Sequence, residues 1–183
     1  MTPGAATRVL EAIGAVMTRI DPAQVAAACA TIAGAGRIMA HGCGREGLMM
    51  QGFAMRLHHL GLEACMQGDM AAPPLGPGDL FIASAGPGEL SSVSALMRTA
   101  RDAGAEVLLL TALPDTPSAA HANQVLALPA QTMASDAGAE TAMPMGSAYE
   151  GALFVLFEVM VADLARRLGQ SADDMRARHT NME

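Results

Sequence analysis

The chain has 183 residues, of which 51% are hydrophobic and only 3% aromatic, with no tryptophan. Its net charge of −7 and its isoelectric point of about 5.1 argue against binding to nucleic acid or to an anionic membrane surface. All 11 basic residues are arginine, which excludes a Schiff-base lysine and the lysine of a Walker-type phosphate loop. The length suits one domain with an aliphatic core whose gaps methionine fills.

Cysteine usage and the N-terminal residues predict a cytoplasmic protein. The cysteines Cys29, Cys43 and Cys65 are scattered without a C-x-x-C pair, which favours reduced thiols. The first residues lack the basic and apolar regions of a signal peptide. The longest apolar stretch, around 152–162, is interrupted by Glu158 and is too short to span a bilayer.

The first third of the chain is expected to contain three helices and a strand. A hydrophobic stripe predicts a helix over 5–20. Asp21 and Pro22 form an N-cap followed by a proline at the first helical position, so a second helix should run to about residue 33. A short apolar strand at 37–41 leads through a glycine turn into a helix over 45–60.

The rest of the chain continues this alternation. Further strands are expected at 62–66, 79–84, 106–111 and 124–128, and loops at 70–78 and 132–143. Further helices are expected at 89–103, 146–168 and 171–178, and a short one within 114–122.

This order predicts an α/β fold with a doubly wound parallel sheet covered on both faces. We expect one domain over 1–183, made of an N-terminal helical segment (1–34), the sheet and its helices (35–145) and C-terminal helices (146–183). In such sheets the ligand lies beyond the carboxyl ends of the strands. The turns at 42–47 and 85–88 are therefore the candidate binding turns.

The turn at 42–47 reads G-x-G-x-x-G between a strand and a helix, which is the fingerprint of dinucleotide binding. In that interpretation Glu63 would contact the ribose. A glycine turn at a helix N-terminus suits any small anion or polar ligand equally well. It can also be a tight turn without a ligand.

Several stretches together, in order along the chain, resemble the SIS (sugar isomerase) family, and within it the 6-phospho-3-hexuloisomerases. They are Gly42–Arg45, Phe53–Leu62, Gly76–Leu80, Gly86–Glu89, Pro144–Glu150 and the tail Met175–Glu183. The resemblance implies a three-layer α-β-α sandwich of flavodoxin-like SIS type, with a five-stranded parallel sheet and two helices before the first strand. It also implies a homo-oligomer, either a tetramer or a dimer, with active sites between subunits. We expect no metal or cofactor.

The resemblance further implies catalytic roles for Glu150 and His179 in moving a carbonyl group through an enediol. Glu150 would carry the proton, and His179 of a neighbouring subunit would assist ring opening or polarise the carbonyl. A buried glutamate suits this task, because burial moves its pKa toward neutral pH. The alternatives are a carboxylate favoured by the helix dipole and a solvated tail histidine.

The other residues expected to contact the substrate lie in and around the two glycine turns and on the helix after the first. They are Gly44, Arg45, Glu46, His59, Ser84, Gly86, Gly88, Glu89, Ser91 and Ser92.

The chain departs from the family where sugar-phosphate members have hydroxyl groups in both turns. Those positions hold Glu46, Ala85, Pro87 and Leu90. A carboxylate facing a phosphate is repulsive, and proline lacks an N–H donor. Ser84, Ser91, Ser92 and Arg45 remain as donors. We therefore expect hexulose 6-phosphate to be a poor substrate, with a sugar, sugar acid or other sugar derivative in its place.

Three further features have more than one interpretation. Cys43 is either a reactive thiol or a space-filling residue of the turn. His58 and His59 point about 100° apart on a helix, which disfavours a shared metal. Met49, Met50 and Met55 are expected in the core or a subunit interface. The rival to an enzyme is a non-catalytic SIS module that senses a carbohydrate derivative.

Overall fold

The computed structural model describes residues 4–135 and 141–182, so part of the expected loop at 132–143 and the last residue of the tail lie outside it. The helices are α1 (Ala5–Met17), α2 (Pro22–Gly34), α3 (Gly44–His59), α4 (Ser91–Asp102), the 3₁₀ helix η1 (Pro117–His121), α5 (Ser147–Leu168) and α6 (Ala172–Ala177). The strands are β1 (Arg37–Gly42), β2 (Glu63–Met66), β3 (Leu80–Ser84), β4 (Glu106–Thr111) and β5 (Gln124–Ala127).

The strands form one five-stranded sheet in the order β2-β1-β3-β4-β5, and every neighbouring pair is parallel. β1 lies between β2 and β3, so the chain reverses its direction of travel across the sheet there. Such a switch point is where ligands bind in open α/β sheets. The register pairs Gly42 with Ser84, which brings the ends of β1 and β3 to the same level.

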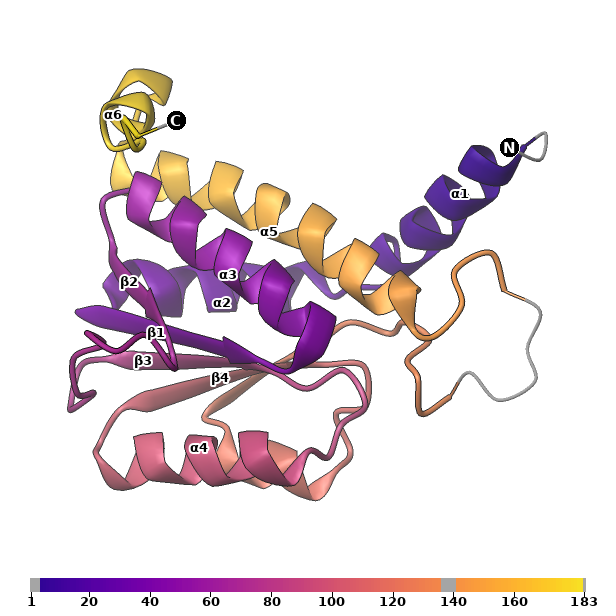
Figure 1. Cartoon of the computed structure of the whole chain (residues 1–183), viewed down its shortest axis with the longest axis horizontal. Coiled ribbons are helices and arrows are strands. Elements are labelled where there is room, and N and C mark those ends of the chain that lie inside the picture. The colour runs from indigo at the N-terminus through magenta and orange to yellow at the C-terminus, as the bar shows by residue number, and fades with distance from the viewer. Residues whose placement is uncertain (1–3, 136–140, 183) are drawn as a thin grey trace.

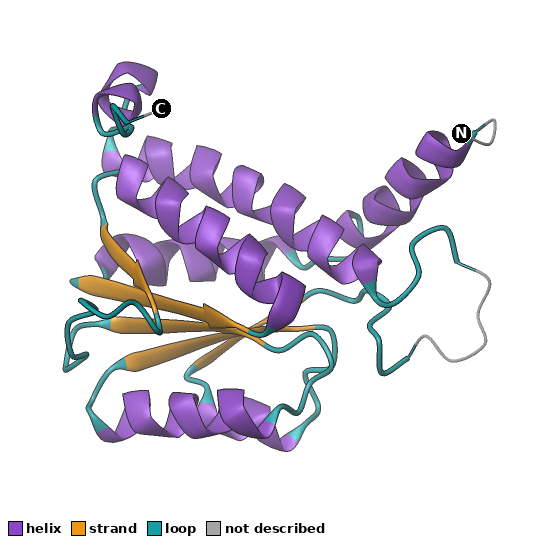
Figure 2. Cartoon of the chain, in the orientation of Figure 1, coloured by secondary structure: helices purple, strands orange, loops and turns teal. Residues whose placement is uncertain are grey.

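Helices cover both faces of the sheet, as Figures 1 and 2 show, and this confirms the predicted α-β-α fold. α2, α3 and α5 lie on one face, over a core that includes Ile38, Ile82 and Leu110. α4 and η1 cover the other face, where Phe81 and Leu109 are buried. α1 packs on α5 but extends away from the rest of the molecule (Figure 1). None of the helices in the described part of the chain has the length and apolarity needed to cross a membrane.

Local sequence explains where several helices begin. Asp21 caps α2 by accepting a hydrogen bond from the Ala23 N–H at 2.8 Å. Ser171 and Asp174 form a capping box at the start of α6. The expected strands and helices are present, with ends shifted by a few residues.

One difference from the predicted boundaries has a visible cause. The helix expected from residue 89 begins at Ser91, because Leu90 is extended and the Glu89 carboxylate bonds to Ser118 instead. The short helix expected within 114–122 is present as the 3₁₀ helix η1, which follows the extended Thr116.

Candidate functional site

A cavity of about 510 Å³ lies where β1 and β3 end and α5 begins. It is lined by Cys43, Gly44, Arg45, Glu46, Pro87, Leu90, Thr132, Met133, Met145, Gly146, Tyr149 and Glu150. The first turn of α3, the turn between β3 and α4, and the first turn of α5 therefore meet at one place. Helix N-termini suit polar and anionic groups, so the predicted position of the site at the carboxyl end of the sheet has a physical basis.

Glu46 is the most closely held polar side chain of this cavity. It is in the first turn of α3 and is only 8% exposed. Its Oε2 accepts a hydrogen bond from Ser84 Oγ at 2.5 Å, and the Gly86 N–H lies 3.1 and 3.0 Å from the two carboxylate oxygens. Burial raises the pKa of Glu46, while the bonds from Ser84 and Gly86 oppose that rise.

Tyr149 and Gly86 complete this arrangement. Tyr149 is 1% exposed, and its hydroxyl lies 3.3 Å from Ser84 Oγ. A Cβ added to Gly86 would lie 2.8 Å from the Tyr149 ring and 3.0 Å from a Glu46 oxygen, so only glycine fits there. Sequence reasoning missed Tyr149, although it is the single tyrosine and directly precedes the predicted catalytic glutamate.

Glu150 lines the same cavity from the first turn of α5. Its Oε1 lies 3.2 Å from Arg45 Nη2. The Arg45 guanidinium also donates to Ser147 Oγ at 2.7 Å and to the Met145 carbonyl at 2.6 Å, which fixes its position. Glu150 Oε2 is buried and has no hydrogen-bond partner among the described residues. A buried carboxylate oxygen without a partner is costly, which marks it as a candidate functional group.

Four of the other predicted residues lie in the turn after β3 and in the first turn of α4. Gly88 has a left-handed φ of 90°, and a Cβ there would clash with Thr116. Glu89 turns toward η1, where it accepts bonds from the Ser118 N–H and hydroxyl at 2.9 and 3.0 Å. Ser91 and Ser92 are exposed in the first turn of α4. Neither they nor Glu89 line the cavity.

Ser84 corrects one expectation. We expected this hydroxyl to be available to a ligand phosphate, but it is fully buried and donates to Glu46. It supports Glu46 from below.

The two histidines of the predicted site lie elsewhere in this chain. His59 ends α3, roughly 22 Å along a helix of 16 residues from the cavity at its start. The His179 ring stacks on His59 with centroids 5.2 Å apart. Figure 1 shows α6 and the C-terminus at this far end. Within one chain, therefore, neither His59 nor His179 is near Glu150, and a role for either histidine at this cavity stays a prediction that requires a second subunit.

The dinucleotide alternative fails on geometry. Glu63 is the first residue of β2, so it lies at the amino edge of the sheet, where it bonds to Arg37 at 2.8 Å. A ribose partner has to lie at the opposite edge, next to the glycine turn. Within the glycine turn itself, Glu46 lies where a pyrophosphate would have to approach.

Cys43 is half-buried at the cavity, with its Sγ 4.0 Å from His41 Nε2 and 3.9 Å from Ser92 Oγ. The described residues contain no group of three His, Cys, Asp or Glu side chains arranged to hold a metal ion. Of the three methionines considered above, Met50 is buried in the core, and Met55 is 50% exposed on the outer side of α3.

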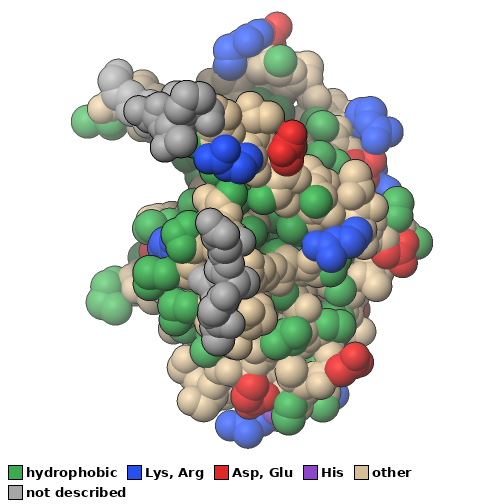
Figure 3. Space-filling model, turned by 90° about the vertical axis from the view of Figure 1, so that its right-hand side faces the viewer, with side chains coloured by type: hydrophobic (Ala, Val, Ile, Leu, Met, Phe, Trp, Pro, Cys, Tyr) green, Lys and Arg blue, Asp and Glu red, His purple; other side chains and the backbone are tan. Residues whose placement is uncertain are grey.

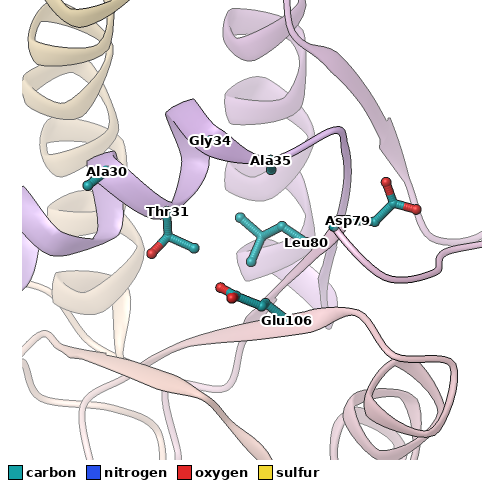
Figure 4. A pocket seen from close by; sticks show the side chains of 8 residues that line it. Ala30, Thr31, Gly34, Ala35, Asp79, Leu80 and Glu106 are labelled. Atoms are coloured by element: carbon teal, nitrogen blue, oxygen red, sulfur yellow. The ribbon is translucent and has the colours of Figure 1, made fainter.

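A second cavity, of about 410 Å³, lies at the amino ends of the strands. Figure 4 shows Thr31, Asp79 and Glu106 around it. The Asp79 oxygens accept bonds from the Arg37 and Gly76 N–H groups, both at 2.9 Å. Both oxygens of this carboxylate therefore serve to hold two loops together. The cavity at the carboxyl ends is the better candidate site.

The chain is similar to known proteins in both sequence and fold. The SIS domain family model matches residues 31–155. A 3-hexulose-6-phosphate isomerase from Mycobacterium gastri is 34% identical over 165 residues, which cover 90% of this chain and 83% of that protein.

Two solved structures share the fold. One is a hypothetical protein from Methanococcus jannaschii for which a 3-hexulose-6-phosphate isomerase function was inferred (TM-score 0.81, 22% identity, 98% of this chain and 97% of that chain). The other is the Vibrio vulnificus NanR protein complexed with ManNAc-6P (TM-score 0.76, 21% identity, 94% of this chain and 65% of that chain). By its sequence match and its fold, this chain belongs to the SIS domain family.

Proposed function

We propose that the protein is a sugar isomerase that moves a carbonyl group along a sugar by proton transfer through an enediol. The observation that supports this most is the buried Glu150 Oε2, which lines the cavity and has no partner among the described residues. A base that takes a proton from the carbon next to a carbonyl needs a free oxygen within reach of the substrate. No redox cofactor is needed, because one carbon loses a proton, the neighbouring carbon gains one, and the sugar undergoes no net oxidation or reduction.

The surroundings of Glu150 suit this role. Arg45 contacts Oε1 and leaves Oε2 unpaired. Because Arg45 is itself bonded to Ser147 and Met145, it restricts the orientation of the carboxylate. A base held in one orientation lowers the entropic cost of reaching the transition state. The name of the Mycobacterium gastri relative supports an isomerase of this type.

A sensor is the second candidate function. The NanR structure, whose title records a complex with ManNAc-6P, shares this fold at 21% identity. A sensor requires a ligand cavity but no free base. The unpaired oxygen of Glu150 favours the enzyme.

We propose that a second copy of the chain completes the site with His179. Leu48, Met55 and Phe154 are each at least 50% exposed and line the outer groove between α3 and α5, an apolar surface of the kind that subunits cover. A cytoplasmic location belongs to the same proposal, and the free state of Cys29, Cys43 and Cys65 supports it.

The test of the enzyme reaction is Glu150→Gln, with Glu106→Gln at the second cavity as the matched control. Wild type incubated with candidate ketoses in D₂O should form the isomer and incorporate solvent deuterium. Glu150→Gln should lose roughly 10²–10⁴-fold in turnover while it keeps ligand affinity, and Glu106→Gln should match wild type. If wild type binds a sugar but neither isomerises it nor exchanges its protons, the sensor is correct.

The test of the shared site is a mixed oligomer. Glu150→Gln and His179→Ala subunits are co-expressed with different tags and purified together. If sites form between subunits, some sites combine an intact glutamate with an intact histidine, and part of the activity returns. An active His179→Ala homo-oligomer, or a monomer in light scattering, would refute this proposal.

A further inference from the structure

We propose that Glu46 is a built-in substitute for a ligand phosphate, so that the cavity takes a sugar that carries no phosphate at this end. This inference rests on the proposed function for the identity of the ligand as a sugar. It extends that function by naming the residue that determines which sugars fit.

The hydrogen-bond donors of the turn after β3 are already occupied by Glu46. The turn after β3 offers a hydroxyl and a backbone N–H, from Ser84 and Gly86, next to the N-terminus of α3. Such a combination of donors holds anions in many proteins. Here both donors are bonded to the Glu46 carboxylate, at distances of 2.5 to 3.1 Å. A ligand phosphate would have to displace a side chain that is only 8% exposed.

The turn after β3 also has no room for a second anionic group. The Glu46 carboxylate lies so close to Gly86 that an added Cβ there would be 3.0 Å from its oxygen. On the other side, the buried Tyr149 ring closes the turn. The next residue, Pro87, has no N–H to offer. The turn therefore holds one anionic group, and that group is already part of the chain.

The charges that line the cavity also disfavour a phosphate. Among the described residues that line the cavity, Glu46 and Glu150 are acidic and Arg45 is basic. Arg45 is already paired with Glu150, and the chain has no lysine. In Figure 3, which views the molecule from this side, the basic side chains lie apart from one another and do not form one patch. A phosphate of charge about −1.5 to −2 would face an acidic cavity, whereas the hydroxyl groups of an uncharged polyol can donate hydrogen bonds to carboxylates.

The test compares wild type with Glu46→Ser and Glu46→Gln by isothermal titration with inorganic phosphate, fructose 6-phosphate and fructose. Wild type should bind fructose 6-phosphate no better than fructose. Glu46→Ser frees the Ser84 and Gly86 donors and should bind phosphate and fructose 6-phosphate at least about tenfold more tightly than wild type does. Glu46→Gln removes the charge but keeps the amide oxygen against Gly86, so it should gain much less.

Two outcomes would overturn the inference. One is tight binding of fructose 6-phosphate to wild type, with fructose bound weakly. The other is a folded Glu46→Ser protein, verified by circular dichroism, that gains no affinity for either phosphate probe. Neither outcome depends on turnover, so a protein that binds sugars without isomerising them would refute the proposed reaction and leave the role of Glu46 intact.

Discussion

The two edges of the sheet each carry a cavity of similar size, about 510 Å³ at the carboxyl ends and about 410 Å³ at the amino ends. Each is lined by two carboxylates: Glu46 and Glu150 at the first, Asp79 and Glu106 at the second. Volume and residue type therefore do not distinguish the edge with the candidate site from the other edge.

The hydrogen bonding of the carboxylates does distinguish them. Asp79 uses both oxygens to hold backbone N–H groups of the chain, whereas Glu150 keeps one buried oxygen without a partner in the described structure. Parallel strands deliver helix N-termini to the carboxyl edge only, so that edge can hold polar ligands. Glu46 is intermediate between these two residues, because it lines the candidate site but is hydrogen-bonded like a structural residue.

The largest expected effect on stability comes from adding one methyl group at each edge. Gly86→Ala would push Cβ into the Tyr149 ring and Glu46, and it should cost about 2–3 kcal/mol. At Gly34, beside the other cavity, an added Cβ would meet no atom within 4 Å. Because alanine is a better helix former than glycine, Gly34→Ala should be neutral or stabilising by up to about 1 kcal/mol. Urea unfolding of both variants measures the difference. Equal effects would show that the close packing at Gly86 is not significant.

The second effect separates a structural carboxylate from a functional one. Asp79→Asn leaves one of two backbone N–H groups facing an amide N–H, and it should cost about 1–2 kcal/mol without affecting turnover. Glu150→Gln loses an ion pair with the half-exposed Arg45, which should change stability by less than about 1 kcal/mol. Unfolding and turnover are measured on both variants. A loss of turnover in Asp79→Asn together with a large loss of stability in Glu150→Gln would contradict this assignment.

The smallest effect is a pH dependence. Burial raises the pKa of Glu46, so the folded protein binds this proton more tightly than the unfolded chain does. The unfolding free energy should therefore fall as pH rises from the ordinary carboxyl pKa of about 4.3 through the raised native value. Glu46→Gln should lack this decline, whereas Glu106→Gln should keep it. Parallel slopes for wild type and Glu46→Gln between about pH 4 and pH 8 would rule out a raised pKa.

Local patterns predicted most of the fold. The buried strand Leu80–Ser84 is a continuous apolar run, and Asp21 with Pro22 marks the start of α2 without reference to the rest of the chain. The alternation of strands and helices then requires parallel pairing, and short connections restrict the topology. Because function in such sheets follows the carboxyl ends of strands, the sequence alone also predicted which turns form the candidate site.

The tertiary structure decided how the polar groups of that site are used. Glu46 and Ser84 are 38 residues apart in the chain, and no local pattern indicates that the Ser84 hydroxyl donates its hydrogen bond to Glu46. Tyr149 closes the turn only because α5 packs there. His179 lies at the far end of α3 because α6 packs there. Secondary structure follows from short-range sterics and periodicity, whereas the partner of a buried polar group depends on which distant elements pack around it.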